Sequence, residues 1–247
     1  MISIKNLHKA FGTKIVLNNV NLTITEGEIL SVIGKSGTGK SVLLKSILGL
    51  LTPDRGEIEI DGINTTGFTE SDYNKKIRLK AAMVFQEGAL WDSMSIEENI
   101  DLALQIQKHL DEKERKRLID ESLDMVDLNG INNVYPDELS GGMMKRVAIA
   151  RAIAMKPKYL LYDEPTTGLD PVLSNVINSL IKKLNTELKI TSLIISHDIK
   201  GVESISDKVA MLYKGEIITV CKADKIWEQE NKIFNDFIRG KIELGQD

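Results

Sequence analysis

The stretch GKSGTGKS, from Gly34 to Ser41, is the part of the sequence whose residue types and spacing point most directly to a reaction. It matches the pattern G-x-x-x-x-G-K-[ST], in which glycines let several backbone N–H groups point into one concavity that holds phosphate. Lys40 would then reach the β- and γ-phosphates of a nucleotide, and the hydroxyl of Ser41 would bind Mg²⁺. An ordinary turn between a strand and a helix is the alternative. The predicted phosphate-binding residues are Gly34, Lys35, Ser36, Gly37, Thr38, Gly39, Lys40, Ser41 and Val42.

A pair of acidic residues, Asp163 and Glu164, follows the apolar run YLLY. In doubly wound sheets, ligands bind beyond the carboxyl ends of the strands. A carboxylate at Asp163 could hold Mg²⁺ directly or through water. Glu164 would point in another direction and could polarise a water molecule. Two surface acids without a shared role are the alternative for an isolated Asp-Glu pair. Beside a phosphate-binding loop, the pair predicts phosphoryl chemistry.

Strands and helices that alternate along the chain must position these residues. The runs EGEILSVIG, AAMVFQ, KYLLYDE and TSLIISHD predict buried strands, and amphipathic segments between them predict helices. This alternation implies a fold of the α/β class with a mostly parallel central sheet. Residues 1 to about 30 carry apolar residues at alternate positions, which predicts short strands in an N-terminal antiparallel β-subdomain.

Two helix starts are marked by local signals. Ser95 and Glu98 form a predicted capping box, and Asp170 precedes Pro171 as a predicted N-cap. We expect one domain over residues 1–247, with a helical subdomain inserted at about 90–156 and a mixed helical tail at about 222–247.

The composition limits the possible classes of function. The chain has 247 residues, 42% hydrophobic residues and a net charge of −4, which gives no support to a nucleic-acid partner. The single cysteine, Cys221, excludes an internal disulfide and is expected to be a small buried residue at a strand end. No apolar run approaches the about 18–20 residues that span a bilayer, and the N-terminus lacks the apolar stretch of a signal peptide. We therefore expect a soluble, cytoplasmic protein that reaches a membrane only through a partner.

Six motifs occur along the chain in the order GKSGTGKS, VFQEG, LSGGM, YLLYDEP, TGLDP and IISHD. In this order they make the sequence similar to the nucleotide-binding subunit of ATP-binding cassette (ABC) transporters. The resemblance extends from about Ile2 to His197 and beyond. It implies an ATPase that uses ATP and Mg²⁺ and works with a transmembrane permease.

The resemblance also implies roles for residues around the nucleotide. Phe11 stands where the family places an aromatic residue, usually tyrosine, that stacks on adenine; a core phenylalanine is the alternative. Gln86 matches the glutamine that senses Mg²⁺ and the attacking water and links hydrolysis to the permease. His197 matches the histidine that contacts the γ-phosphate. The implied catalytic residues are Glu164, His197, Lys40 and Gln86, and the implied metal-binding residues are Ser41, Gln86 and Asp163.

The stretch LSGGMMKRVAIAR predicts a helix that opens with two glycines. Each glycine in a helix interior costs about 1 kcal/mol relative to alanine, which is tolerable if bare N–H groups must approach a phosphate. By resemblance, Ser140, Gly141 and Gly142 close over the γ-phosphate bound to the opposite subunit, and Asp170 lines the dimer interface. One set of motifs in one chain therefore implies a homodimer with two ATP molecules at its interface.

The family's usual LSGGQ reads LSGGM here, so that Met143 replaces a glutamine. FQEGALWDSMSIEEN and LSGGMMKRVAIARAIA look like the ATPase of Mla-type phospholipid transporters. That resemblance implies lipid traffic between the inner and outer membranes of a diderm bacterium, with the ATPase on the cytoplasmic face of the inner membrane. The implied partners are a permease, an MCE-domain lipid-binding subunit and a small STAS-domain protein.

Two other classes of function stay open. In an importer for amino acids or another small solute, Met143 would be a neutral variant. A soluble ABC ATPase without a permease would lack a docking groove, and the apolar stretch GALWDSM, with Trp91 and Met94, is predicted to form one. Ordinary packing of the helical insert is the alternative for that stretch.

Overall fold

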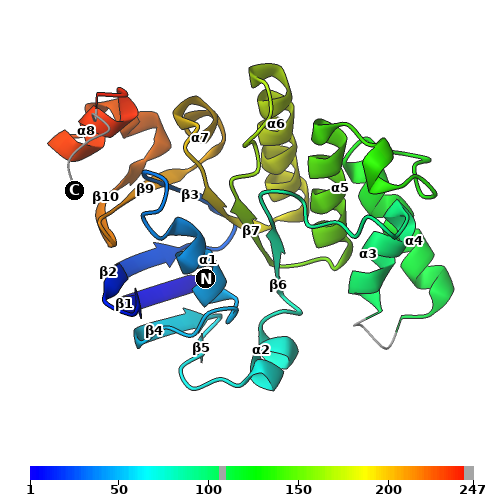
Figure 1. The fold of residues 1–247 in the computed structure, drawn as a ribbon, viewed down its shortest axis with the longest axis horizontal. Coiled ribbons are helices and arrows are strands. Elements are labelled where there is room, and N and C mark those ends of the chain that lie inside the picture. Colours follow the sequence, from blue (N-terminus) through cyan, green and yellow to red (C-terminus); the bar gives the residue numbers. More distant parts are fainter. Residues whose placement is uncertain (106–109, 242–247) are drawn as a thin grey trace.

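The computed structural model describes residues 1–105 and 110–241. Its strands form two sheets, and Figure 1 shows the smaller one at the lower left. Helices α3 (Ile96–Leu104), α4 (Glu112–Met125) and α5 (Gly141–Ala154) gather on the opposite side of the molecule. The α/β class predicted from the sequence is confirmed.

The N-terminal sheet has the strand order β2-β1-β4-β5, and each neighbouring pair is antiparallel. Its strands are β1 (Ile2–Phe11), β2 (Lys14–Ile24), β4 (Arg55–Ile60) and β5 (Ile63–Asn64). The prediction of short strands was wrong for the first two, which pair along almost their whole length through several register shifts. Asn6 and Asn19, with φ of 50° and 52°, lie at two of these shifts. Bulges of this kind let the ladder continue where strict alternation fails.

The central sheet has the order β10-β9-β3-β8-β7-β6, in which only β10 pairs antiparallel. Every residue of β3, β7 and β8 is buried, because helices cover one face of the sheet, and α1 (Lys40–Ile47) together with the N-terminal sheet covers the other. The predicted mostly parallel sheet is confirmed. The strands are β3 (Ile29–Ile33), β6 (Ala81–Val84), β7 (Tyr159–Asp163), β8 (Thr191–Ile195), β9 (Lys208–Tyr213) and β10 (Glu216–Lys222).

The helices begin where the sequence signals place them. Ser95 and Glu98 form the predicted capping box, and Asp170 Oδ1 accepts hydrogen bonds from the N–H groups of Val172 and Leu173. The helices are α1 (Lys40–Ile47), α2 (Glu70–Lys76), α3 (Ile96–Leu104), α4 (Glu112–Met125), α5 (Gly141–Ala154), α6 (Pro171–Leu188), α7 (Ile199–Ile205) and α8 (Lys232–Ile238), with 3₁₀ turns η1 (Pro136–Glu138) and η2 (Ala223–Glu228).

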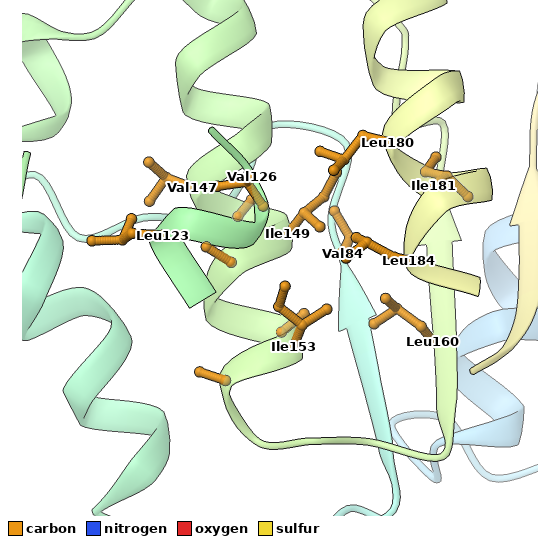
Figure 2. Close-up of a cluster of buried hydrophobic side chains, with 14 of the residues drawn as sticks. Val84, Leu123, Val126, Val147, Ile149, Ile153, Leu160, Leu180, Ile181 and Leu184 are labelled. Carbon is orange, nitrogen blue, oxygen red and sulfur yellow. The ribbon is translucent and has the colours of Figure 1, made fainter. Parts of the chain in front are cut away.

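Helix α5 is fixed in a large apolar cluster. In Figure 2, Leu123 of α4 and Val126 just after that helix lie beside Val147, and Leu180 of α6 lies beside Ile149 on the other side of the helix. All five side chains are buried, and each such side chain stabilises the fold by about 1.5–3 kcal/mol relative to an exposed one. The start of α5, which carries LSGGM, is therefore held rigidly against both its helical neighbours and the sheet.

The C-terminal region departs from expectation in one detail. Cys221 is half-buried, not buried, because β10 is the edge strand of its sheet. η2 and α8 form the described part of the predicted helical tail, and residues 242–247 lie outside the described residues. Among the helices that the structure describes, none is long and apolar enough to cross a membrane.

Candidate nucleotide-binding and catalytic site

The loop from Gly34 to Ser41 connects β3 to α1 and requires glycine at two positions. A Cβ on Gly34 would lie 2.3 Å from the carbonyl oxygen of Leu212, and one on Gly39 would lie 2.8 Å from that of Val16. Gly39 also has a left-handed φ of 101° and caps α1 without any side-chain hydrogen bond. The N–H groups at the start of α1 are thus left for an external acceptor, as phosphate binding requires.

Lys40 is buried beneath this loop. Its Nζ donates to the carbonyl oxygens of Gly34 at 2.8 Å and Lys35 at 2.9 Å. Burial lowers the pKa of Lys40, and the charges of Glu164 and Asp163 oppose that shift. Both acids of the Asp163–Glu164 pair therefore act electrostatically on the ammonium group of Lys40.

Ser41 and Asp163 meet across 122 residues of sequence, as their predicted shared role requires. Ser41 Oγ donates to Asp163 Oδ1 at 2.8 Å. Burial raises the pKa of Asp163, and the hydrogen bond from Ser41 opposes this effect. Mg²⁺ binds oxygen ligands and is usually held by one or two carboxylates together with substrate phosphates and water. The Ser41–Asp163 pair fits such an ion, and within residues 1–105 and 110–241 no cluster of three or more His, Cys, Asp or Glu residues offers a competing site.

Glu164 lies at the end of β7 in a left-handed conformation with φ of 49°, and its N–H donates to the carbonyl oxygen of Ile195 at 3.0 Å. Its Oε2 accepts a hydrogen bond of 2.8 Å from Thr167 Oγ1 and lies 3.3 Å from Nδ1 of His197. His197 follows β8 with 58% of its side chain exposed. The structure thus brings the predicted base and the predicted γ-phosphate contact together. Thr167 was not identified as a site residue from the sequence. A hydroxyl residue only three positions after Glu164 could have indicated this contact.

Gln86 lies two residues after the end of β6. Together with Asp163 and Lys45 it lines one open cavity. Its backbone carbonyl accepts a hydrogen bond from Nζ of Lys145, which is buried on α5. This contact was also missed, because LSGGMMKR does not reveal where the lysine points. We name residues 86–90 the Gln86 loop.

A second group of predicted site residues consists of Ser140, Gly141, Gly142 and Asp170. Ser140 Oγ accepts a hydrogen bond from the N–H of Met143 at 3.3 Å, so Ser140 is the N-cap of α5. A Cβ on Gly142 would contact Leu173 of α6 at 3.3 Å, so the starts of α5 and α6, including Asp170, lie together. Ser140 and Gly141 themselves are exposed.

Phe11 lies at the end of β1. Its side chain is 47% exposed, so it is not a core residue, and Nζ of Lys9 lies 5.4 Å from its ring centroid. An exposed ring beside a cation offers a face to which a planar base could stack. The structure thus leaves the adenine-stacking prediction open and removes the core alternative.

The strand–loop–helix from β3 to α1, together with the acidic pair at the end of β7, defines a nucleotide-binding ATPase of the P-loop class. A family model described as "ABC transporter" matches residues 17–167. The chain belongs to the ABC transporter family as an ATP-binding subunit.

Relatives and solved structures agree with this assignment. The chain is 39% identical to the methionine import ATP-binding protein MetN of Legionella pneumophila (strain Lens), with 98% of this chain and 70% of MetN aligned. It is 36% identical to the intermembrane phospholipid transport system ATP-binding protein MlaF of Haemophilus influenzae, with 98% and 91% aligned. A dimeric ATP-binding cassette bound to ADP and Pi superposes with a TM-score of 0.83 at 36% identity, over 90% of this chain and 99% of that one.

These findings establish an ATP-binding subunit that hydrolyses ATP in an ABC transporter. ABC cassettes form dimers and work with a transmembrane permease. The relatives include phospholipid, methionine and Fe³⁺ transport proteins, so the family match does not single out the Mla type.

Proposed function

We propose that this chain powers phospholipid transport between the inner and outer membranes, as the ATPase of a Mla-type transporter. The observation that carries the proposal is the sequence of the two segments around the transport-coupling residues, FQEGALWDSM and LSGGMMKR, with Met143 in place of glutamine. The similarity to MlaF over 91% of its length supports it. So does a relative from Arabidopsis thaliana, named trigalactosyldiacylglycerol 3, which is 36% identical over 98% of this chain.

In this proposal, the backbone of the Gly34–Ser41 loop and Lys40 hold the phosphates of ATP. Mg²⁺ held by Ser41 and Asp163, with Gln86 beside it, would neutralise charge on the β- and γ-phosphates. Glu164 accepts a proton from water as its oxygen attacks the γ-phosphorus. The bond from that phosphorus to the bridging oxygen breaks, and ADP and phosphate leave. A positioned general base of this kind accelerates a reaction by about 10²–10⁴-fold.

A second copy of the chain completes each ATP site in our proposal. Ser140, Gly141 and Gly142 of one copy close over the γ-phosphate held by the other, and Asp170 lies at the interface. The exposure of Ser140 and Gly141 supports this role. So does the absence of acidic residues in the first turn of α5, because a carboxylate there would repel phosphate.

The permease would dock near the Gln86 loop. Trp91 is 58% exposed and Leu90 lines the open cavity next to Gln86, so apolar surface is available directly beside the residue that would sense Mg²⁺. This position supports the predicted docking groove at GALWDSM. The assembly would sit at the cytoplasmic face of the inner membrane, with an MCE-domain subunit and a small STAS-domain protein as further partners.

The transport assignment is tested by tagging the chain, solubilising membranes in mild detergent and identifying the captured proteins and lipids by mass spectrometry. We expect a permease, an MCE-domain subunit and bound phospholipid. A permease with a solute-binding protein and no lipid would refute the phospholipid assignment. It would favour the second candidate, an importer of a small solute, which the 39% identity to MetN supports.

The catalytic assignment is tested by Glu164→Gln, which keeps the side-chain shape and removes the base. We expect ATP binding at parent affinity, hydrolysis slower by about 10²-fold or more, and a trapped dimer on size-exclusion chromatography with ATP. Hydrolysis at the parent rate would show that Glu164 is not the base.

A further inference from the structure

The Gln86 loop is attached to α5 through its backbone. Lys145 donates to the carbonyl of Gln86, while Arg151 donates to the carbonyls of Gly88 at 2.8 Å and Ala89 at 2.6 Å. Gly88 and Ala89 have left-handed φ values of 79° and 50°, a conformation that turns these carbonyls toward one side of the chain. Two cations on one helix therefore bind three carbonyls of the Gln86 loop.

The fit between loop and helix is close. A Cβ on Gly88 would contact the Cβ of Ala148 at 3.6 Å, and Gly88 is buried against α5. Lys145 is also buried, and burial lowers its pKa, while the charges of Glu87 and Glu164 oppose that shift. A buried cation is costly unless its hydrogen-bond acceptors are in place, so the loop is stable in one position relative to α5.

The same helix, α5, carries Ser140, Gly141 and Gly142 at its N-terminus. The apolar cluster that surrounds α5 makes the helix a rigid body. A displacement of its N-terminus must therefore displace Lys145 and Arg151, and with them the carbonyl of Gln86.

We propose that Lys145 and Arg151 are positioning residues that clamp the Gln86 loop to α5, so that the position of Gln86 relative to Asp163 follows the helix that meets the second nucleotide. We call the two residues the α5 clamp. The inference rests on the proposed role of Gln86 at the metal. It adds a direct physical link, within one chain, between the surface that contacts the partner's ATP and the residue that senses Mg²⁺ at the chain's own ATP.

The test measures how ATP hydrolysis by the full chain depends on Mg²⁺ concentration. Lys145→Met replaces lysine with an unbranched side chain of similar length that cannot donate a hydrogen bond. Because a hydrogen bond from a charged donor is lost, we expect a fall in kcat and a rise in the half-saturating Mg²⁺ concentration, each about tenfold, with KM for ATP at saturating Mg²⁺ changed by less than about twofold. Lys145→Arg retains a cationic donor and should recover most of both losses.

Arg151→Lys is the second variant, because it keeps the positive charge but removes the planar fork of N–H donors that reaches both carbonyls. It should shift the Mg²⁺ dependence in the same direction by about threefold. Arg146→Met is the matched control: Arg146 lies on the same helix and also binds backbone carbonyls, but those of Val126 and Asp127 near the end of α4. It should lower the melting temperature and leave the half-saturating Mg²⁺ concentration unchanged.

Three results would overturn the inference. Lys145→Met could hydrolyse ATP with the parent's Mg²⁺ dependence, or Lys145→Met and Arg146→Met could lower kcat equally without moving that dependence. The third is an unchanged Mg²⁺ dependence of ATP hydrolysis in Gln86→Ala, which would show that Gln86 does not sense Mg²⁺. If Gln86→Ala shifts the dependence and Lys145→Met does not, the role of Gln86 stands and the α5 clamp alone is wrong.

Discussion

Thr167 controls the orientation of the proposed base, and replacing it by valine isolates that role. Thr167 Oγ1 donates to Glu164 Oε2 at 2.8 Å, and the same oxygen lies 3.3 Å from Nδ1 of His197. Valine has nearly the same shape as threonine but cannot donate. The variant Thr167→Val therefore keeps the packing of the turn and frees one oxygen of the carboxylate.

The size of the effect follows from the kind of bond that is lost. A hydrogen bond to a charged group contributes about 1.5–3 kcal/mol, and each ~1.4 kcal/mol is a factor of ten in rate. Glu164 keeps its strained backbone conformation and its contact with His197, so we expect about the lower end of that range, a tenfold fall in kcat. KM for ATP should stay within about twofold, because the hydroxyl and the N–H of Thr167 both donate to Glu164, the proposed base, and not to the groups that hold the phosphates.

The assay is steady-state phosphate release at saturating Mg²⁺ and ATP, with Thr167→Ser as the control. Serine keeps the hydroxyl, so its kcat should lie within about threefold of the parent. The melting temperatures of both variants are measured alongside. A valine variant at the parent rate, or a serine variant as slow as valine, would refute the idea that this hydroxyl holds Glu164 in place.

Three further substitutions probe other parts of the molecule. Asp170→Ala removes the acceptor at the start of α6 and should cost about 0.5–2 kcal/mol of unfolding free energy in urea, whereas Asp170→Ser should cost less; equal stability of all three proteins would contradict the capping role. Burial alone would raise the pKa of Asp61, but hydrogen bonds from Tyr159 and Lys158 outweigh it and lower the pKa to about 2. Because the folded pKa of Asp61 is depressed, this stabilisation is present above the unfolded pKa of about 3.9 and is lost as the pH falls toward 2. Asp61→Asn should therefore cost about 1–2 kcal/mol of unfolding free energy at pH 7 and much less at pH 2. An equal cost at both pH values would show that the charge of Asp61 is not the source of the stabilisation. Met143→Gln should retain ATPase activity within about threefold of the parent, since Met143 packs against the helical core and contacts the phosphates of neither site in our proposal; complete loss of phosphate release would contradict that.

Features encoded by a few neighbouring residues could be predicted from the sequence. The phosphate-binding loop, the capping box at Ser95 and the cap at Asp170 depend on local spacing, so their patterns are complete within a short window. The meeting of Ser41 with Asp163 was also predictable, although they are distant in sequence, because each follows the carboxyl end of a parallel strand.

Features that depend on side-chain direction or on imperfect pairing could not be predicted in this way. Lys145 sits in a helix that is apolar around most of its circumference, so its position in the pattern does not show that it points at the Gln86 loop. The long hairpin of β1 and β2 was underestimated, because register shifts at Asn6 and Asn19 break the alternation that marks a strand. In both cases tertiary contacts decide the outcome.

Among helices α1 to α7, the charges at the helix starts distinguish the two helices of the proposed phosphate-binding surfaces from the others. Helices α2, α3 and α4 have acidic residues in their first turns, and Asp170 and Asp198 cap α6 and α7. In contrast, α1, α5 and the short α8 begin without a carboxylate. A carboxylate at a helix start neutralises the positive end of the helix dipole. Among α1 to α7, every helix has such a carboxylate except α1 and α5, the two helices that carry the proposed phosphate-binding surfaces. The first turns of α1, which follows the phosphate loop, and of α5 contain no acidic residue of their own. Ser140 at the start of α5 accepts one hydrogen bond and also carries a hydroxyl proton that it can donate. Two such surfaces on separate helices of one chain are what a site shared between two copies requires.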